Sequence, residues 1–243
     1  MLLIVVWQAA CSLNIWPEYL FPGPIAVLNS LIGSLRNGTL LVSLYTSLRR
    51  IVIGFGISLA GGVITGLLVG RSALLHDTIG SIMLGLQTLP SICWLPLALL
   101  WFGLSERAIL FVIIMGAFVA VAVSTEAGVR QIPPLYLQAA RNMGARGYRL
   151  YRDVIIPAAL PGMITGMKLG WSFAWRSLMA GELLYVNLGL GHLLMMGREL
   201  SDMAQVVMVM LLLIIIGLIS DKLIFARLES FVYERWGLKK SVR

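Results

Sequence analysis

Long stretches of this chain carry no charged residue, and their lengths predict membrane-spanning helices. Twenty uncharged residues lie between Arg50 and Arg71, and a helix of that length spans about 30 Å, the hydrocarbon thickness of a bilayer. Three further uncharged stretches, the apolar start of the chain and an apolar segment after Pro161 extend the same pattern. Together they predict six spans, at roughly residues 1–17, 51–70, 78–103, 108–126, 161–184 and 203–221.

The composition indicates a membrane protein rather than a soluble one. Hydrophobic residues make up 59% of the chain and charged residues 12%, whereas about a quarter of the residues in a soluble domain are charged. The expected fold class is an all-α integral membrane protein, with residues 1–243 forming a single transmembrane domain. Its first span is the weakest. The alternative for this stretch is a cleaved signal peptide. A signal peptide needs basic residues near its start, and the first basic residue of this chain is Arg36.

The basic residues gather in three segments, and this asymmetry predicts the orientation of the chain. Most arginine and lysine residues lie in residues 71–77, 129–160 and 222–243, and basic segments of this kind stay in the cytosol. The other side holds only Arg36, Arg107 and Arg198, with Arg49 and Arg50 near its interface. We therefore expect both termini to be cytosolic. The net charge of +8 then reflects topology, and no basic surface for nucleic acid is expected.

Residue types that carry catalysis or bind metals are few and scattered. Cys11 and Cys93 fall in apolar segments, and His76 and His192 have no second histidine or cysteine nearby, so none of them has the spacing of a metal site. The chain also lacks the Gly-x-x-x-x-Gly-Lys-Ser/Thr phosphate loop. We expect no catalytic residue, no metal, no cofactor and no ATP hydrolysis by the chain itself.

The basic segment 129–160 is the longest polar one, and its first half predicts a short helix. Pro133 and Pro134 end the fourth span and suit the first turn of a helix over residues 135–143. Gly144 follows at a position where the end of a helix favours a positive φ. The segment is therefore expected to turn at this glycine.

The second half of the segment predicts another short helix, over residues 146–155. Pro157 and Pro161 follow it and are expected to break it. Arg149 lies four residues before Asp153, so these two side chains can pair on one face. The whole segment then lies across the inner membrane surface as two helices joined by a glycine turn. The alternative is an ordinary basic loop held near anionic lipid, which the arginines alone would permit.

Two prolines, Pro90 and Pro96, interrupt the third predicted span. Each removes a backbone donor and clashes with the preceding turn, so a continuous helix is not expected. Broken helices in membranes need protein or water to satisfy the freed carbonyl groups, and in transporters they commonly lie beside the substrate path. The alternative is a kink that only shapes helix packing. The polar or amphipathic residues that would line such a path are Gln87, Thr88, Ser91 and Trp94.

The fifth predicted span carries two cations, Lys168 and Arg176. A cation in the middle of a span costs about 2.5–3.5 kcal/mol to insert, so it normally faces a partner or a water-filled cavity. Lys168 lies near the cytosolic end and is expected to extend toward the interface. Arg176 lies deeper, and we expect it to face the path together with Ser172 and to favour an anionic solute. The alternative is a buried ion pair of Arg176 with Glu182 or with an acid of a partner subunit.

The segment from Gln138 to Pro157 resembles the coupling-loop signature of the membrane subunits of bacterial ATP-binding-cassette (ABC) importers. That signature reads Glu-Ala-Ala, three residues, Gly, nine residues and Ile-x-Leu-Pro, and its spacing is kept here. Gln138 replaces the glutamate, so hydrogen bonding is retained but the charge is lost. The residues that the resemblance implies as contacts of an ATPase subunit are Gln138, Ala139, Ala140, Met143, Gly144, Val154, Ile156 and Pro157.

Other pieces of the chain are similar to the permeases of the nitrate, sulfonate and taurine importer group. They are residues 20–24, 47–50, 54–55, 89–97, 101–104, 182–184 and 189–191, with Trp236 in the tail. The resemblance implies a type I ABC importer core of the MetI kind in the bacterial inner membrane. It also implies a small anionic solute, such as nitrate, a sulfonate, taurine or bicarbonate. Arg176 departs from this group, in which an apolar residue is usual at that position.

The same resemblance implies partners. ATP and Mg²⁺ would be bound by two separate ATPase subunits, and two permease copies would face each other as a twofold homodimer. A periplasmic solute-binding protein would deliver the solute to outer loops around residues 104–107 and 185–203, with Asn187, Gly189 and Gly191 as contacts. The chain would then be a permease and not an enzyme.

Two other classes of membrane protein remain as alternatives. A secondary transporter driven by an ion gradient usually shows an inverted repeat or an acidic residue within a span. The sequence shows no such repeat, and Glu126 and Glu182 lie at the ends of predicted spans. A membrane-embedded enzyme would need clustered His, Asp or Glu at membrane depth, and the two histidines lie far from any such cluster. The sequence therefore favours the ABC permease.

Overall fold

The structure is a computed structural model that describes residues 6–9, 11, 17, 20–184 and 188–235. These residues form helices and no strand, which confirms the all-α fold class. The helices are α2 (Pro24–Arg36), α3 (Thr39–Arg71), α4 (Ala73–Leu75), α5 (Ser81–Gln87), α6 (Leu95–Phe102), α7 (Glu106–Arg130), α8 (Pro134–Asn142), α9 (Tyr148–Leu150), α10 (Ile156–Leu184), α11 (Leu190–Glu199), α12 (Met203–Ser220) and α13 (Ala226–Arg235). A 3₁₀ turn lies at Ser91–Trp94, and π-helical turns lie at His76–Gly80, Tyr151–Ile155 and Asp221–Phe225.

Helix α7 packs against α3 on one side and α10 on the other. Small residues bring the three backbones close together. A Cβ atom at Gly66 of α3 would fall 2.5 Å from the carbonyl oxygen of Ala122, and one at Gly162 of α10 would fall 2.7 Å from the Cα atom of Gly128. Small residues allow such close packing in a membrane, where burial of apolar surface provides little driving force between helices. The three helices therefore form one tightly packed unit.

Four helical stretches among the described residues are long and apolar enough to cross a membrane. They are Thr39–Arg71, Glu106–Arg130, Tyr148–Leu184 and Met203–Val232. A fifth span results if Ala73–Gln87 and Ser91–Phe102, which are bent by 101° at a short break, count as one. These stretches match the five predicted spans that follow residue 50, whereas the predicted span 1–17 lies mostly outside the described residues.

The span predicted at 51–70 is longer than expected because Arg49 and Arg50 lie inside α3 rather than ending it. Arg49 forms an ion pair with Glu106 at 2.8 Å, and Arg50 forms one with Glu182 at 2.9 Å. These ion pairs compensate the charges of the two arginines, which the prediction from hydropathy took as the start of the span. Helix α2, which precedes this span, was not predicted.

The prediction that Pro157 and Pro161 break the second loop helix is wrong. Tyr148–Leu184 is one helical stretch, in which the π-helical turn Tyr151–Ile155 precedes Pro157 and α10 contains Pro161. A π-helical turn shifts the hydrogen-bond register by one residue, which offers the Pro157 ring relief from a clash one turn back. Membrane helices also tolerate internal proline better than soluble helices do. The same turn changes the side-chain spacing, and Arg149 and Asp153 form no ion pair in the described structure.

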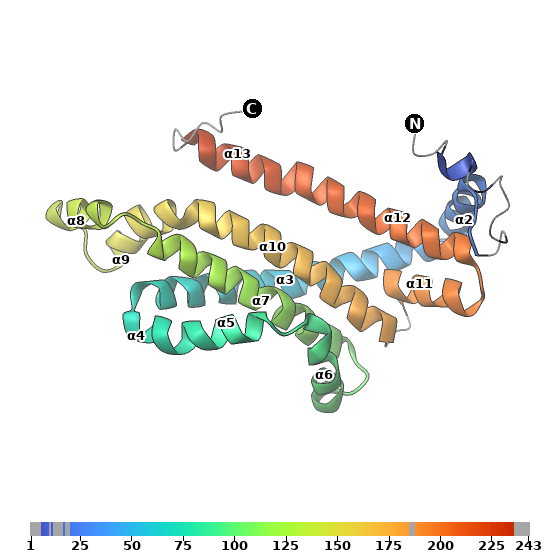
Figure 1. The fold of residues 1–243 in the computed structure, drawn as a ribbon, viewed down its shortest axis with the longest axis horizontal. Coiled ribbons are helices and arrows are strands. Elements are labelled where there is room, and N and C mark those ends of the chain that lie inside the picture. The colour runs from blue at the N-terminus through green and yellow to red at the C-terminus, as the bar shows by residue number, and fades with distance from the viewer. Residues whose placement is uncertain (1–5, 10, 12–16, 18–19, 185–187, 236–243) are drawn as a thin grey trace.

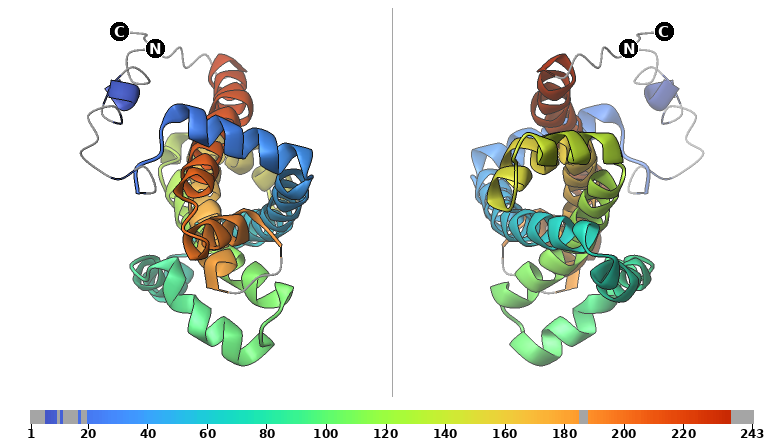
Figure 2. Two further views of the ribbon diagram at one scale, coloured as in Figure 1. Left: turned by 90° about the vertical axis from the view of Figure 1, so that its right-hand side faces the viewer. Right: turned by 90° about the vertical axis from the view of Figure 1, so that its left-hand side faces the viewer.

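The predicted break in the third span is confirmed at Pro90 but not at Pro96. Helix α5 ends at Gln87, and Pro90 precedes the 3₁₀ turn at Ser91–Trp94. Pro96, in contrast, lies in the first turn of α6, where no intrahelical donor is lost. Helix α6 projects away from the rest of the bundle (Figures 1 and 2).

The bundle has two distinct ends, which we call the α8 end and the α11 end. Helices α8 and α9 lie at the α8 end of the long axis, and α2 and α11 lie at the α11 end (Figure 1). Helix α4 lies toward the α8 end, and α12 leads into α13 in the same direction (Figure 1). The three predicted basic segments, as far as they are described, are therefore directed to the same end.

Candidate functional site

The segment resembling a coupling loop folds into α8 and a glycine turn at the α8 end. Helix α8 begins at Pro134, and Gly144 has a φ of 85°. The amide of Ala145 donates to the carbonyl oxygen of Ala140 at 2.9 Å, a bond that closes the end of a helix around a left-handed residue. The expected turn at Gly144 is therefore present.

One face of this segment is buried against the start of the long helix that follows. Ala140 packs in a cluster with Ile155 and Ala159, and Val154 and Ile156 are partly buried against the same cluster. The two halves of the resembling segment, which are separate in sequence, are thus brought together. This apolar contact joins α8 to the long helical stretch Tyr148–Leu184.

The other face of the segment is exposed and carries apolar as well as polar side chains. Gln138 and Ala139 are exposed, and Met143 has an exposed fraction of 87% and Tyr148 of 77%. Leu135 at the start of α8 is exposed as well. Contiguous exposed apolar groups rimmed by polar residues mark interaction sites. The α8 end is therefore a candidate docking surface for another protein.

A pocket of about 240 Å³ lies beside the bend between α5 and α6. The residues predicted to line a path from this bend are all in its wall: Gln87, Thr88, Ser91 and Trp94. Arg176 reaches the same pocket from α10. The structure thus places these five side chains around one cavity.

A larger pocket, of about 720 Å³, lies between α10 and α12. Ser172 and Arg176 line it together with apolar side chains such as Trp171, Met179 and Leu213. Arg176 is therefore the predicted path residue that lines both pockets. It therefore lies between the small cavity, whose wall includes Gln87, Thr88 and Ser91, and the larger one.

Arg176 has no acidic partner among the described residues. Its guanidinium carbon lies 5.5 Å from the centre of the Phe173 ring, a contact in the range of a cation–π interaction. The alternative pairing of Arg176 with Glu182 is wrong, because Glu182 binds Arg50 instead. Lys168 forms a partly exposed ion pair with Asp221 at 2.8 Å.

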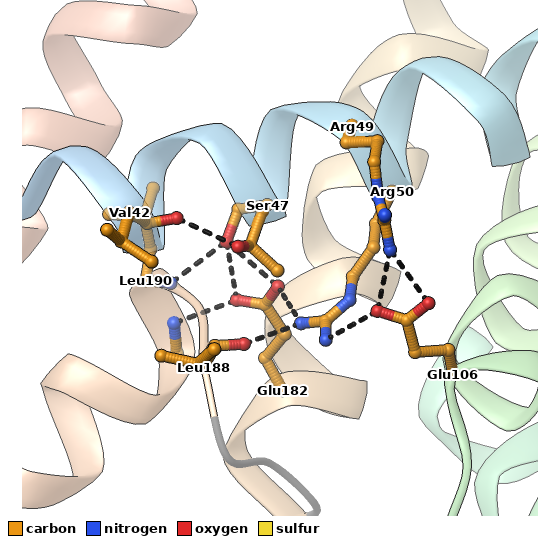
Figure 3. A network of polar contacts seen from close by, with 10 residues as sticks. Val42, Ser47, Arg49, Arg50, Glu106, Glu182, Leu188 and Leu190 are labelled. Atoms are coloured by element: carbon orange, nitrogen blue, oxygen red, sulfur yellow. Dashed lines mark hydrogen bonds and ion pairs between the residues drawn. The ribbon is translucent and has the colours of Figure 1, made fainter.

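Glu182 is the centre of a buried polar network at the α11 end (Figure 3). Its carboxylate accepts hydrogen bonds from Ser47 Oγ at 2.8 Å, from Arg50 Nη1 at 2.9 Å and from the amide of Gly191 at 2.9 Å. Arg50 also pairs with Glu106 at 3.2 Å. The network joins α3, α7, α10 and the start of α11. Of the predicted binding-protein contacts, Gly189 and Gly191 lie here, and Asn187 lies outside the described residues.

A second buried acid, Glu126, lies near the other end of α7 and contacts Nδ1 of His76. His76 begins the π-helical turn that follows α4. Glu126 and Glu182 lie near the ends of α7 and α10, as expected, and both are buried and paired. No group of three or more His, Cys, Asp or Glu could hold a metal ion within the described part of the chain.

A family model described as the binding-protein-dependent transport system inner membrane component matches residues 58–229. This chain belongs to that family. The matched range contains the α5–α6 bend, α8 with its glycine turn, and both pockets. The permease also carries Arg50 and Ser47 just before the matched range.

Relatives over nearly the whole length support the same assignment. A Methanocaldococcus jannaschii protein, provisionally named as an ABC transporter permease, is 33% identical over 226 residues, covering 91% of this chain and 84% of the relative. The nitrate import permease NrtB of Synechocystis is 29% identical over 239 residues, covering 95% and 86%. Further relatives are named for taurine and, provisionally, for aliphatic sulfonates. The resemblance found in the sequence is thereby confirmed.

A solved structure confirms the fold. An inward-facing conformation of the MetNI methionine ABC transporter aligns with a TM-score of 0.68 and 20% identity, covering 80% of this chain and 96% of that one. The predicted MetI-like core is therefore present. This permease is a multi-pass membrane subunit of an ABC importer, and its family implies an ATPase and a solute-binding protein as partners. An ion-driven secondary transporter is not favoured.

The sequence did not reveal which residues the two buried acids of the permease pair with. Arg50 and Glu182 are separated by 132 positions, and His76 and Glu126 by 50 positions. A local hydropathy pattern carries no information on pairs so far apart. The available signal was that Arg50 and Glu182 both stand next to apolar spans, where an uncompensated charge is costly.

Proposed function

We propose that this permease forms the membrane path for a small anionic solute and works with two separate ATPase subunits. The observation that carries the anionic part is Arg176, a cation deep in α10 that lines both pockets and has no acidic partner in the described structure. A solvated cavity and a passing anion offset the cost of placing a cation at this depth. Gln87, Thr88 and Ser91 add neutral hydrogen-bonding groups beside it.

The choice of solute class is also supported by the relatives. The names of several refer to nitrate, taurine or aliphatic sulfonates, and all of these carry a negatively charged oxyanion group. A bicarbonate-like anion belongs to the same chemical class. A guanidinium suits these ligands because its planar donors match carboxylate-like and sulfonate oxygens.

The α8 end is proposed to be the place where ATP hydrolysis by a separate subunit drives movement of the permease. The exposed apolar face of α8 and the turn, with Gln138, Ala139 and Met143, would dock an ATPase subunit that binds ATP and Mg²⁺. Gly144 shapes the turn, and Val154, Ile156 and Pro157 connect it to the membrane helix. The chain itself contributes no ATP-hydrolysing residue, so hydrolysis belongs to the ATPase.

The assembly is proposed to be a twofold homodimer in the bacterial inner membrane, with both termini and the α8 end in the cytosol. Each permease copy offers one docking segment, and two ATPase subunits closing on ATP would move the two segments together. The α11 end would then face the solute-binding protein. Movement of each packed unit as a rigid body would open the path alternately to the two sides.

The role of Arg176 is tested with Arg176→Gln in the permease–ATPase complex reconstituted in liposomes with its solute-binding protein. Uptake of radiolabelled nitrate, taurine and an alkanesulfonate is measured. We expect the uptake of the solute that the wild type transports to fall by about tenfold or more, because the loss of a charge-assisted contact costs about 1.5–3 kcal/mol. The matched control is Arg227→Gln, which removes an exposed charge from α13. Unchanged uptake by an intact Arg176→Gln complex would refute the role.

A further inference from the structure

The four residues at the start of α11, from Leu188 just before it to Gly191 in its first turn, are held in place by the side chains of the buried network. The amide of Gly191 donates to Glu182 Oε2 at 2.9 Å, and the amide of Leu190 donates to Ser47 Oγ at 2.9 Å. The carbonyl oxygen of Leu188 accepts from Arg50 Nη1 at 2.7 Å. Three backbone groups of one short segment are therefore satisfied by three side chains from other helices (Figure 3).

Two glycines let this segment approach the carboxylate. Gly189 has a φ of 148°, and a Cβ atom there would fall 2.6 Å from the Glu182 carboxylate. A Cβ atom at Gly191 would fall 2.5 Å from Glu182 Cβ. Any other residue at either position would push the segment away from the acid. The segment is thus shaped to fit Glu182.

The network continues from the buried acid to the surface. Arg50 has an exposed side-chain fraction of 8% and Glu106 of 52%, and their atoms lie 3.2 Å apart. Glu106 also pairs with Arg49 at 2.8 Å, on the exposed side of the network. Leu104 and Leu188, which are both exposed, lie close in sequence to Glu106 and to the glycines. The network thus runs from the buried Glu182 to the exposed pair of Arg49 and Glu106, and an exposed apolar residue flanks it in sequence at each end.

Stability alone does not account for this arrangement. Buried ion pairs are commonly matched in stability by apolar side chains of similar volume, and Arg50 Nε is buried here without a partner among the described atoms. Apolar side chains could hold α3 and α10 together, but they would offer nothing to the backbone groups of residues 188–191. The specific result of the network is the conformation of that segment.

We propose that Glu182 is a positioning residue for the docking of the solute-binding protein. Its carboxylate, with Ser47 and Arg50, fixes Leu188 to Gly191 in one conformation and so presents the α11 end ready for the partner. This inference rests on the proposed function, in which the α11 end faces that protein. A pre-ordered docking segment improves affinity because less conformational freedom is lost on binding.

The first experiment measures hydrogen exchange in the permease–ATPase complex. In Glu182→Gln the amides of Leu190 and Gly191 lose protection, while α3 and α10 keep theirs. The matched control is Glu199→Gln, which removes an exposed charge from the end of α11 and leaves the exchange of residues 188–191 unchanged. Unchanged exchange in Glu182→Gln overturns the proposal. Loss of protection throughout α3 and α10 also overturns it, because Glu182 would then serve helix packing.

The second experiment measures ATPase stimulation against the concentration of the system's own solute-binding protein, purified with the solute it retains. In Glu182→Gln the half-saturating concentration rises about tenfold, as expected for a lost charged hydrogen bond, and the maximal stimulated rate is kept. Gly189→Ala changes no side chain of the network but places a methyl group against the Glu182 carboxylate, and it raises the half-saturating concentration as well. A half-saturating concentration unchanged in both variants overturns the positioning role. If the wild type itself is not stimulated, the proposed function fails instead.

Discussion

Gly162 of α10 lies against Gly128 of α7 with so little space that a Cβ atom at position 162 would fall 2.7 Å from the Cα atom of Gly128. The obstacle is backbone, which cannot rotate away as a side chain can. This contact fixes how closely α10, which carries Arg176, packs on the central helix. A side chain larger than hydrogen at position 162 would therefore push α7 and α10 apart at this point.

The first prediction concerns this contact. Gly162→Ala is expected to destabilise the permease by about 1–3 kcal/mol, because an added methyl group in a well-packed contact forces the backbone to shift. The control is Gly56→Ala in α3, where a Cβ atom would meet nothing within 4 Å and helix propensity favours alanine by up to about 1 kcal/mol. Thermal unfolding of the purified complex in detergent measures both. Equal unfolding temperatures for the two variants would contradict the packing described.

The second prediction concerns the turn at the α8 end. Gly144→Asp is expected to abolish solute-stimulated ATPase activity, because it places a carboxylate in a left-handed turn on the proposed ATPase-docking face. The φ of Gly144 is 85°. The control is Gly144→Asn, which has the same shape without the charge and tolerates this backbone conformation, so it retains more activity. Stimulated activity is measured in liposomes. Full stimulation of Gly144→Asp would place the docking site elsewhere.

The third prediction concerns the position at which the chain departs from the signature. Gln138→Glu restores the acid and is expected to be tolerated, since Gln138 is exposed and a surface charge changes an interaction by about 1 kcal/mol or less. The apparent affinity of the ATPase subunit for the permease should therefore change by less than about fivefold. A pull-down titration with the purified ATPase measures it. A loss of assembly would show that the ATPase is matched to an uncharged residue here.

The sequence predicted those features of the fold that depend on short stretches of chain. The uncharged run after Arg50 predicted the membrane part of α3, and Pro133 with Gly144 predicted the borders of α8, because insertion cost and turn geometry are local properties. Pro157 and Pro161 led to the wrong prediction of a helix end. The π-helical turn before Pro157 offers its ring relief from a clash, and α10 continues through Pro161. A change of hydrogen-bond register of that kind leaves no mark in the residue pattern.

The candidate sites, like the fold, were predicted from the sequence only in their local features. The α5–α6 bend and Arg176 could be singled out from the sequence, since proline and a cation are both conspicuous in an apolar span. Their meeting around one pocket, and the engagement of Glu182 by Arg50 rather than by Arg176, could not. Both depend on how α3, α7 and α10 pack, and that packing is decided by glycine contacts between helices far apart in the chain.

The last prediction concerns the buried contact between His76 and Glu126. The side chain of Glu126 has an exposed fraction of 8% and that of His76 of 38%. Removing the histidine leaves a buried carboxylate without this partner, so His76→Ala is expected to cost about 1–3 kcal/mol. Glu126→Gln is expected to cost less, because the more exposed His76 can turn to water. The stability cost is therefore expected to be larger when Glu126 loses its partner than when His76 does.

A double-mutant cycle separates this contact from general effects of the substitutions. The combined variant His76→Ala/Glu126→Gln has no buried charge at this position, so it should be more stable than the sum of the single changes indicates, with an interaction energy of about 0.5–3 kcal/mol. Unfolding of all four forms in the same detergent provides the measurement. Additive costs would mean that the two side chains are neighbours without a stabilising interaction. A double variant that is more stable than additivity predicts would show that this pair stabilises the contact of the π-helical turn after α4 with α7.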